Sequence, residues 1–96
     1  MPHIDVVMVT GRTEEQKKRL ADAIAKAVSE IAVAPLPNIS VAIRDCDNED
    51  WKTEVWDKRQ VPNLPYMYKK PGYTYDEKDY VSDPADMAPP EEDKND

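Results

Sequence analysis

The chain of 96 residues has no phenylalanine, only two glycines and a single cysteine, Cys46. A lone cysteine excludes an intramolecular disulfide and favours a reducing compartment. No apolar run approaches the length that crosses a bilayer, and the residues at the start do not form a secretory signal sequence. No stretch combines basic and aromatic residues as nucleic-acid-binding surfaces do. These absences predict a cytoplasmic protein with neither membrane nor nucleic-acid partners.

The net charge of −7 comes entirely from the end of the chain. Residues 1–73 carry 11 acidic and 11 basic side chains, whereas residues 74–96 carry 9 acidic and 2 basic ones. This last segment is also rich in proline and poor in aliphatic residues, so it cannot bury enough apolar surface to offset its ordering entropy. We expect one small domain over residues 1–73 and an acidic, largely disordered tail over residues 74–96. Tyr75, Tyr80 and Val81 are the candidates for docking the start of this tail.

Residues 3–10 are dense in valine and isoleucine on both faces, which predicts a strand that is covered on both sides. Thr13 and Gln16 then have the spacing of a capping box, and the apolar periodicity predicts a helix over residues 14–32. The expected apolar stripe of this helix consists of Leu20, Ala23, Ile24, Ala27, Val28 and Ile31.

Two prolines shortly after the helix end it, and residues 38–44 have the pattern of a second strand. The order strand, helix, strand predicts an α/β fold, a βαβ unit with two parallel strands and a right-handed crossover. Two strands and one helix are not stable alone, and the face carrying Val7, Val9 and Ala42 lacks a cover. We therefore expect a homo-oligomer that completes the protomer.

After the second strand a polar stretch leads to Trp51, and a short helix is expected over residues 50–58. Trp56 is expected to pack in the core or at a subunit contact. Trp51 lies among polar residues, so a lid or an interface anchor is the better interpretation.

Pro2 is the first candidate for chemistry. If Met1 is removed, the proline nitrogen becomes a secondary amine, and α-amino groups titrate at about 7.7 to 8.0. An apolar pocket or a nearby cation lowers that value and leaves a neutral amine that can accept and return a proton. A proline at the start of a strand is also common without any function. His3 falls on the opposite face of the strand and is interpreted as structural.

Arg12 is the second candidate, because it follows the first strand and precedes a helix amino terminus. A cation there is unfavourable unless it faces an anion, and a guanidinium grips a carboxylate at two points. The alternative is a solvated turn residue that pairs with Glu15.

Several short motifs together resemble the 4-oxalocrotonate tautomerase family over about residues 2–73. They are the start PHIDV, the run GRTEEQKKRL into the helix, the Ala34-Pro35 stop, the second strand and a following aromatic residue. The ending, with two tryptophans and then KKPGY, looks like the longer bacterial members that act on phenylenolpyruvate. That resemblance implies a homodimer in preference to a hexamer.

The resemblance also implies roles for single residues. Pro2 would shuttle the proton between an enol and carbon, Arg12 would bind the substrate carboxylate, and Trp51 would line the apolar side of the pocket. The family's second arginine falls on Ser40, a departure that favours a carboxylic-acid substrate with one carboxylate and an apolar or aromatic end. Arg44 shares the strand face of Ser40 but lies about 13 Å along it.

The leading hypothesis is therefore an isomerase that converts enol or dienol forms of 2-oxo acids to the keto form. Such proton transfer needs neither a metal nor a nucleotide, and we expect no cofactor. Two alternatives stay open. The same proline could assist water addition or dehalogenation of unsaturated acids, with help from Asp5, Asp45 or Asp47. The protein could also be a non-enzymatic oligomeric scaffold whose acidic tail recruits a basic partner.

Overall fold

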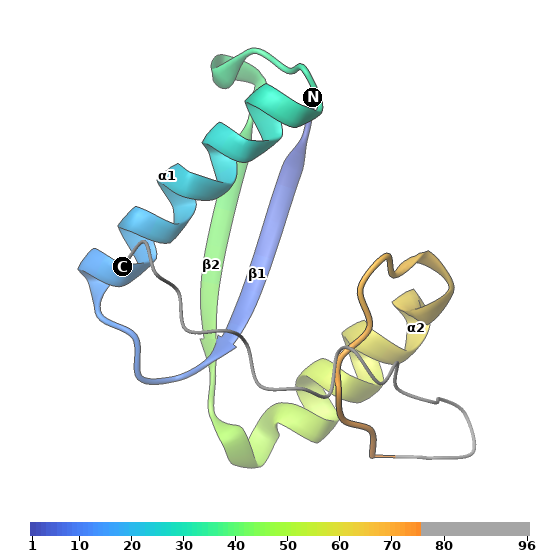
Figure 1. Ribbon diagram of the computed structural model, residues 1–96. Coiled ribbons are helices and arrows are strands. Elements are labelled where there is room, and N and C mark those ends of the chain that lie inside the picture. Colours follow the sequence, from blue (N-terminus) through green and yellow to red (C-terminus); the bar gives the residue numbers. More distant parts are fainter. Residues whose placement is uncertain (76–96) are drawn as a thin grey trace. The chain divides into compact units, whose positions relative to one another are not determined.

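The computed structural model describes residues 1–75, which belong to two compact units (Figure 1). The first unit is Met1–Trp51, and the second begins at Lys52. The predicted docking residues Tyr80 and Val81 lie outside the described residues, as does nearly all of the predicted tail.

The first unit is a βαβ unit, as the sequence predicts. Strand β1 (His3–Val9) is followed by helix α1 (Glu14–Ile31) and strand β2 (Ser40–Cys46). The two strands pair in parallel, with His3 opposite Ser40 and Val9 opposite Cys46. Helix α1 runs back along one face of this two-stranded sheet (Figure 1). The α/β fold class is confirmed.

The capping box at the start of α1 is present as expected. The Gln16 backbone N–H donates to Thr13 Oγ1 over 3.1 Å, and the Thr13 N–H donates to Gln16 Oε1 over 2.8 Å. Both donors would otherwise lack a partner inside the helix, so the pair defines the first turn.

Helix α1 ends in a turn that contains a residue with a left-handed backbone conformation. Val33 has φ 56°, and the Ala34 N–H reaches back to the Ser29 carbonyl over 3.2 Å. The Ser29 hydroxyl also donates to the Ala34 carbonyl over 2.6 Å. This six-residue closure is a common helix ending, but glycine normally occupies the position of Val33.

The strand boundaries differ from the prediction. Strand β2 begins at Ser40, not at residue 38, because Leu36–Asn38 forms a 3-10 turn (η1) in which the Asn38 N–H bonds the Pro35 carbonyl over 3.0 Å. The strand also continues two residues further than expected. Strand β1 ends one residue early, although the Thr10 N–H still donates to the Cys46 carbonyl over 3.2 Å.

The apolar stripe of α1 is rotated relative to the prediction. Leu20, Ile24 and Val28 are half-buried as expected, but Ile31 is 83% exposed. Ala23 and Ala27 are expected on the inward face but are exposed, whereas Ala21 and Ala25 are half-buried instead. Lys17 also lies on the inward side, because its side chain turns toward the sheet to reach Asp45.

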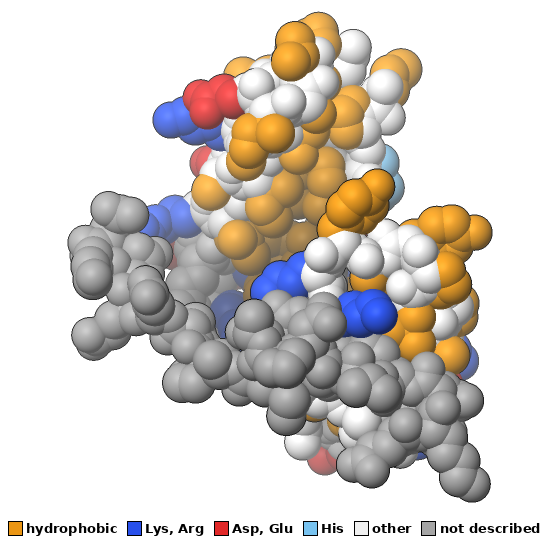
Figure 2. All heavy atoms as spheres, turned by 45° about the vertical axis from the view of Figure 1, so that its right-hand side comes forward, with side chains coloured by type: hydrophobic (Ala, Val, Ile, Leu, Met, Phe, Trp, Pro, Cys, Tyr) orange, Lys and Arg blue, Asp and Glu red, His pale blue; other side chains and the backbone are white. Residues whose placement is uncertain are grey.

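The first unit has no fully buried residue. Figure 2 shows hydrophobic side chains on the surface of the protein. In the first unit, exposed hydrophobic residues include Ile31, Val33 at 84% and Leu36 at 59% exposure. Strand alternation places Val7 and Ala42 on the sheet face opposite α1. Helix α1 alone therefore does not supply a complete core.

The second unit contains the two buried hydrophobic residues among those described, Val55 and Trp56. They lie on a π-helix, Lys52–Gln60 (η3), which continues into α2 (Val61–Asn63) and a 3-10 turn, Leu64–Tyr66 (η4). The helix expected over residues 50–58 is therefore shifted toward the carboxyl end and passes through Pro62.

Trp56 is a core residue of the second unit, as predicted. Its ring centroid lies 5.9 Å from that of Tyr73 and 5.5 Å from that of Tyr75. The Tyr73 hydroxyl is held by Gln60, whose Nε2 donates to it over 2.9 Å. Tyr75 is thus docked against Trp56, as the sequence suggested for the start of the tail.

Candidate active site

The four predicted site residues lie at the two opposite ends of the sheet. Pro2 and Ser40 lie at the amino ends of the strands, and Arg12 and Trp51 follow their carboxyl ends (Figure 1). A seven-residue strand spans about 20 Å at about 3.3 Å per residue. Within one chain, a small organic acid can therefore touch one pair or the other but not both.

At the amino end, Pro2 is half-buried and is held by β2. Its carbonyl accepts a hydrogen bond from the Ser40 N–H over 3.2 Å. The neighbouring His3 places Nδ1 2.6 Å from Ser40 Oγ. The sequence predicts a structural role for His3 and gives no sign of this contact, because the register of two strands separated by a helix is not visible in the sequence.

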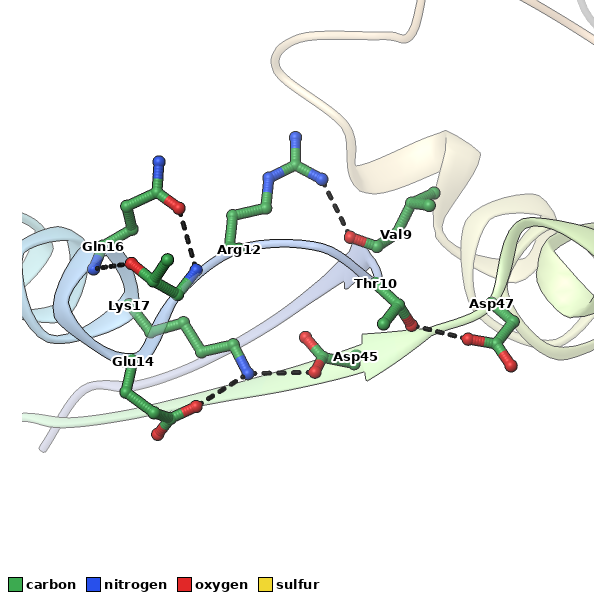
Figure 3. Close-up of polar contacts among 9 residues, drawn as sticks. Val9, Thr10, Arg12, Glu14, Gln16, Lys17, Asp45 and Asp47 are labelled. Atoms are coloured by element: carbon green, nitrogen blue, oxygen red, sulfur yellow. Dashed lines mark hydrogen bonds and ion pairs between the residues drawn. The ribbon is translucent and has the colours of Figure 1, made fainter.

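At the carboxyl end, Arg12 is oriented by the backbone of its own turn. Its Nη1 donates to the Val9 carbonyl over 2.8 Å, and Figure 3 shows the guanidinium pointing away from Asp45 and Asp47. The alternative pairing with Glu15 is not observed, and no acidic side chain within residues 1–75 forms an ion pair with Arg12. A guanidinium has five N–H donors, so this arrangement leaves a fork that fits a carboxylate.

The acidic residues around this turn are already held by neighbours. Asp45 pairs with Lys17 over 2.9 Å, and Asp47 accepts from the Thr10 hydroxyl over 2.7 Å (Figure 3). The pKa of Lys17 is raised above its ordinary value of 10.5, first by the hydrogen bond to Asp45 and then by the one to Glu14. Each contact engages one oxygen of its carboxylate, Oδ2 of Asp45 and Oδ1 of Asp47.

Asp5 and Arg44 also hold each other, as an ion pair on the sheet face opposite α1. Arg44 is therefore engaged within its own chain, which disfavours a role in place of the second arginine that the sequence resemblance leads one to expect at Ser40. The same contact occupies Asp5, the third acidic residue considered for water activation.

Trp51 is positioned by a short turn after β2. Asn48–Asp50 forms a 3-10 turn (η2), and the Trp51 N–H closes it by donating to the Asn48 carbonyl. The side chain is half-buried. Trp51 thus follows the same end of the sheet as Arg12.

Within residues 1–75, no group of three or more histidine, cysteine, aspartate or glutamate side chains is arranged to hold a metal ion. No helix in the described part of the chain is both long and apolar enough to span a membrane.

Comparison with known proteins identifies the family. The family model described as "Tautomerase enzyme" matches residues 2–56. The protein named Tautomerase PptA from Enterobacter sp. (strain 638) is 37% identical over 75 residues, which cover 77% of this chain and 99% of that protein. The 2-hydroxymuconate tautomerase of Pseudomonas putida is 37% identical over 51 residues, covering 53% of this chain and 81% of the relative.

The solved structures agree with the sequence matches. YwhB, a homologue of 4-oxalocrotonate tautomerase, superposes with a TM-score of 0.52 at 31% identity, over 56% of this chain and 88% of that one. The chain belongs to the tautomerase family. The protein is therefore an isomerase, and the fold and family that the sequence predicts are both confirmed.

Proposed function

We propose that the protein converts enol forms of 2-oxo monoacids with an apolar or aromatic end, such as phenylenolpyruvate, to the keto form. Pro2 is the combined base and acid, and the reaction uses no cofactor. The observation that carries this proposal is the position of Pro2. It begins the match to the tautomerase family and lies at the head of β1, beside a hydrogen-bonding side chain from β2.

The reaction moves one proton and needs no oxidant or reductant. The Pro2 nitrogen takes the proton of the enol hydroxyl, and the oxygen electron pair forms the carbonyl bond. The carbon–carbon double bond opens and its terminal carbon takes a proton from the Pro2 ammonium. The amine is thereby regenerated, as general acid–base catalysis requires.

This role requires removal of Met1, because a proline nitrogen in a peptide bond shares its electron pair with the carbonyl and cannot act as a base. It also requires a neutral amine near pH 7. Free α-amino groups titrate at about 7.7 to 8.0, and enclosure in an apolar pocket lowers that value.

We propose that each site combines the Pro2 end of one protomer with the Arg12 end of another. The two ends lie about 20 Å apart within a chain, too far to hold one small acid. The first unit has no fully buried residue, and hydrophobic side chains lie exposed on its surface, so a second copy has apolar surface to cover. Arg12 would then bind the carboxylate, and Trp51 would form the apolar wall. A homodimer is the smallest assembly that provides this.

The substrate class follows from the charges that the site offers. Ser40 occupies the position of the family's second arginine, and Arg44 is already paired with Asp5. One guanidinium matches one carboxylate, which favours a monoacid over a dicarboxylate.

The lone cysteine fits a reducing, cytoplasmic location.

The direct test combines mass spectrometry of the mature amino terminus with the Pro2→Ala variant, assayed on phenylenolpyruvate. We expect the mass of the chain without Met1 and a loss of turnover of about 100-fold or more in the variant, the scale of general acid–base catalysis. Pro35→Ala, a change at an exposed proline before the η1 turn, is the control and should retain turnover. Unchanged turnover in Pro2→Ala would refute the proposal.

A further inference from the structure

The amino end of the sheet holds a polar pair that the family resemblance does not explain. His3 and Ser40 are direct partners in the parallel register, and their side chains meet at 2.6 Å between Nδ1 and Oγ. Both residues are exposed, and the backbone of Ser40 is bonded to the carbonyl of Pro2. His3 directly follows Pro2 in the chain, and the Ser40 N–H donates to the Pro2 carbonyl, so both residues adjoin the proposed catalytic residue.

We propose that His3 donates its Nδ1–H to Ser40 Oγ and thereby directs the Ser40 hydroxyl hydrogen outward, to a carbonyl or carboxylate oxygen of a 2-oxo monoacid. Ser40 is then a substrate-binding residue and His3 its positioning residue. The inference rests on the proposed function, because it supplies the oxygen-binding group for the same reaction.

The number of hydrogens decides between the two possible directions of this bond. A serine hydroxyl has one hydrogen and two acceptor lone pairs, whereas a neutral imidazole donates from one nitrogen and accepts at the other. If Ser40 donated to His3, only lone pairs would face the substrate oxygen and would repel it. If His3 donates, the hydroxyl hydrogen remains for the substrate, and the two bonds in series polarise each other.

This pair also explains how the site can work without the second arginine. A hydroxyl backed by an imidazole donor can stabilise one oxygen, but it lacks the two-point grip of a guanidinium on a whole carboxylate. On the same sheet face, Arg44 is engaged with Asp5. The chain thus offers this end of a substrate a single oriented hydrogen bond, which suits a 2-oxo group better than a second carboxylate.

The chain contains one histidine, so the ring signals of His3 can be assigned without ambiguity in NMR spectra. The binding test uses phenylpyruvate as the probe and the Pro2→Ala variant as the protein, which separates binding from turnover. We expect saturable shifts of the His3 ring nitrogens and a proton on Nδ1 in the complex. Ser40→Ala in the same background should weaken phenylpyruvate binding about tenfold, the cost of one hydrogen bond to a charged or polarised oxygen. Ser40→Thr keeps the hydroxyl on a strand-compatible residue, so its loss of phenylpyruvate affinity should be smaller than that of Ser40→Ala.

Kinetics supply the second test, with Pro2 intact. His3→Phe and Ser40→Ala should each reduce kcat/KM for phenylenolpyruvate about tenfold, and the double variant should lose no more than either one, because both remove the same hydrogen bond. His3→Asn offers a side-chain N–H in a similar place and should recover part of the loss. A merely structural His3 would instead leave kcat/KM unchanged in folded His3→Phe.

The proposal is overturned if phenylpyruvate leaves the His3 signals unmoved, if Nδ1 is unprotonated in the complex, or if folded Ser40→Ala binds and reacts like the parent. If Ser40→Ala fails to fold, the proposal is still tested by the response of the His3 ring signals to phenylpyruvate and by the comparison of His3→Asn with His3→Phe. Failure of the proposed function would appear separately, as a Pro2→Ala variant that turns over phenylenolpyruvate like the parent. The failure of either proposal is thus recognisable by itself.

Discussion

Lys17 on α1 and Asp45 on β2 form an ion pair of 2.9 Å that ties the first turns of the helix to the carboxyl end of the sheet. The lysine side chain is only 17% exposed, and Glu14 bonds the same ammonium over 3.2 Å. The contact joins the start of α1, which directly follows the Arg12 turn, to the end of β2.

The Lys17 pair predicts a stability difference that disappears in alkali. Because the pKa of Lys17 is raised by Asp45 and then Glu14, the charged form favours the folded state. The contribution is complete below the ordinary lysine value of 10.5 and is lost as the pH rises through the raised value. Urea unfolding should show Lys17→Met less stable than the parent at pH 7 and 9, with the gap closing as the pH rises further above 10.5. Lys18→Met, at the exposed pair with Asp22, is the control and should show a much smaller gap. A gap that widens in alkali would contradict this.

The capping box of α1 predicts a local loss of stability. Thr13→Ala removes the acceptor of the Gln16 N–H and should lower the free energy of unfolding by about 1 kcal/mol. Gln16→Ala removes the reciprocal bond and should cost less. Lys26→Ala, a surface change in the middle of the helix, should stay within about 0.5 kcal/mol of the parent. Equal effects for Thr13→Ala and Lys26→Ala in chemical unfolding would show that the cap contributes nothing.

Val33 predicts a stabilising substitution. A β-branched residue at φ 56° is strained, and its side chain is 84% exposed, so it contributes little packing in the protomer. Val33→Gly should raise the free energy of unfolding by about 0.5 to 1 kcal/mol. The substitution removes the strain of a side chain in the left-handed region, and the greater backbone entropy of glycine in the unfolded chain offsets part of that gain. The neighbouring Ala32→Gly, at φ −85°, should instead lower it by a similar amount. If Val33→Gly destabilises the oligomer, the Val33 side chain is packed against a partner copy.

The separation of Pro2 and Arg12 predicts complementation between two inactive variants. Pro2→Ala and Arg12→Ala should each lose activity on phenylenolpyruvate, Arg12→Ala mainly through KM. If each site of a symmetric dimer combines the two ends of different copies, unfolding and refolding an equal mixture should restore about a quarter of the parental activity. Refolded Pro2→Ala alone is the control. No recovery in mixtures that demonstrably contain mixed dimers would contradict a shared site.

Much of this architecture was readable from residue types and their spacing. The capping residues Thr13 and Gln16 predict the helix start correctly, and the alternation of apolar residues predicts both strands and their order. The burial of Trp56 follows from its place in a short helix with Val55. These features are local, so the sequence contains the interactions that define them.

The features that the sequence did not reveal depend on pairing between distant segments. The inward position of the Lys17 side chain depends on its contact with Asp45, 28 residues away. The contact of His3 with Ser40 depends on a register that spans 37 residues, including a whole helix. The turn that delays β2 results from a local bond of the Asn38 N–H, which competes with strand formation. Contacts of this kind arise only when the packed elements fix the register.

The place of Pro2 at the head of β1 has a practical consequence for anyone who produces this protein. An affinity tag fused ahead of Met1 would leave the ring nitrogen as an ordinary amide and put a bulky polypeptide beside Ser40. If Pro2 is the proposed base, purification handles belong on the acidic carboxyl-terminal side, and an inactive preparation with an amino-terminal tag does not test the activity of the mature protein.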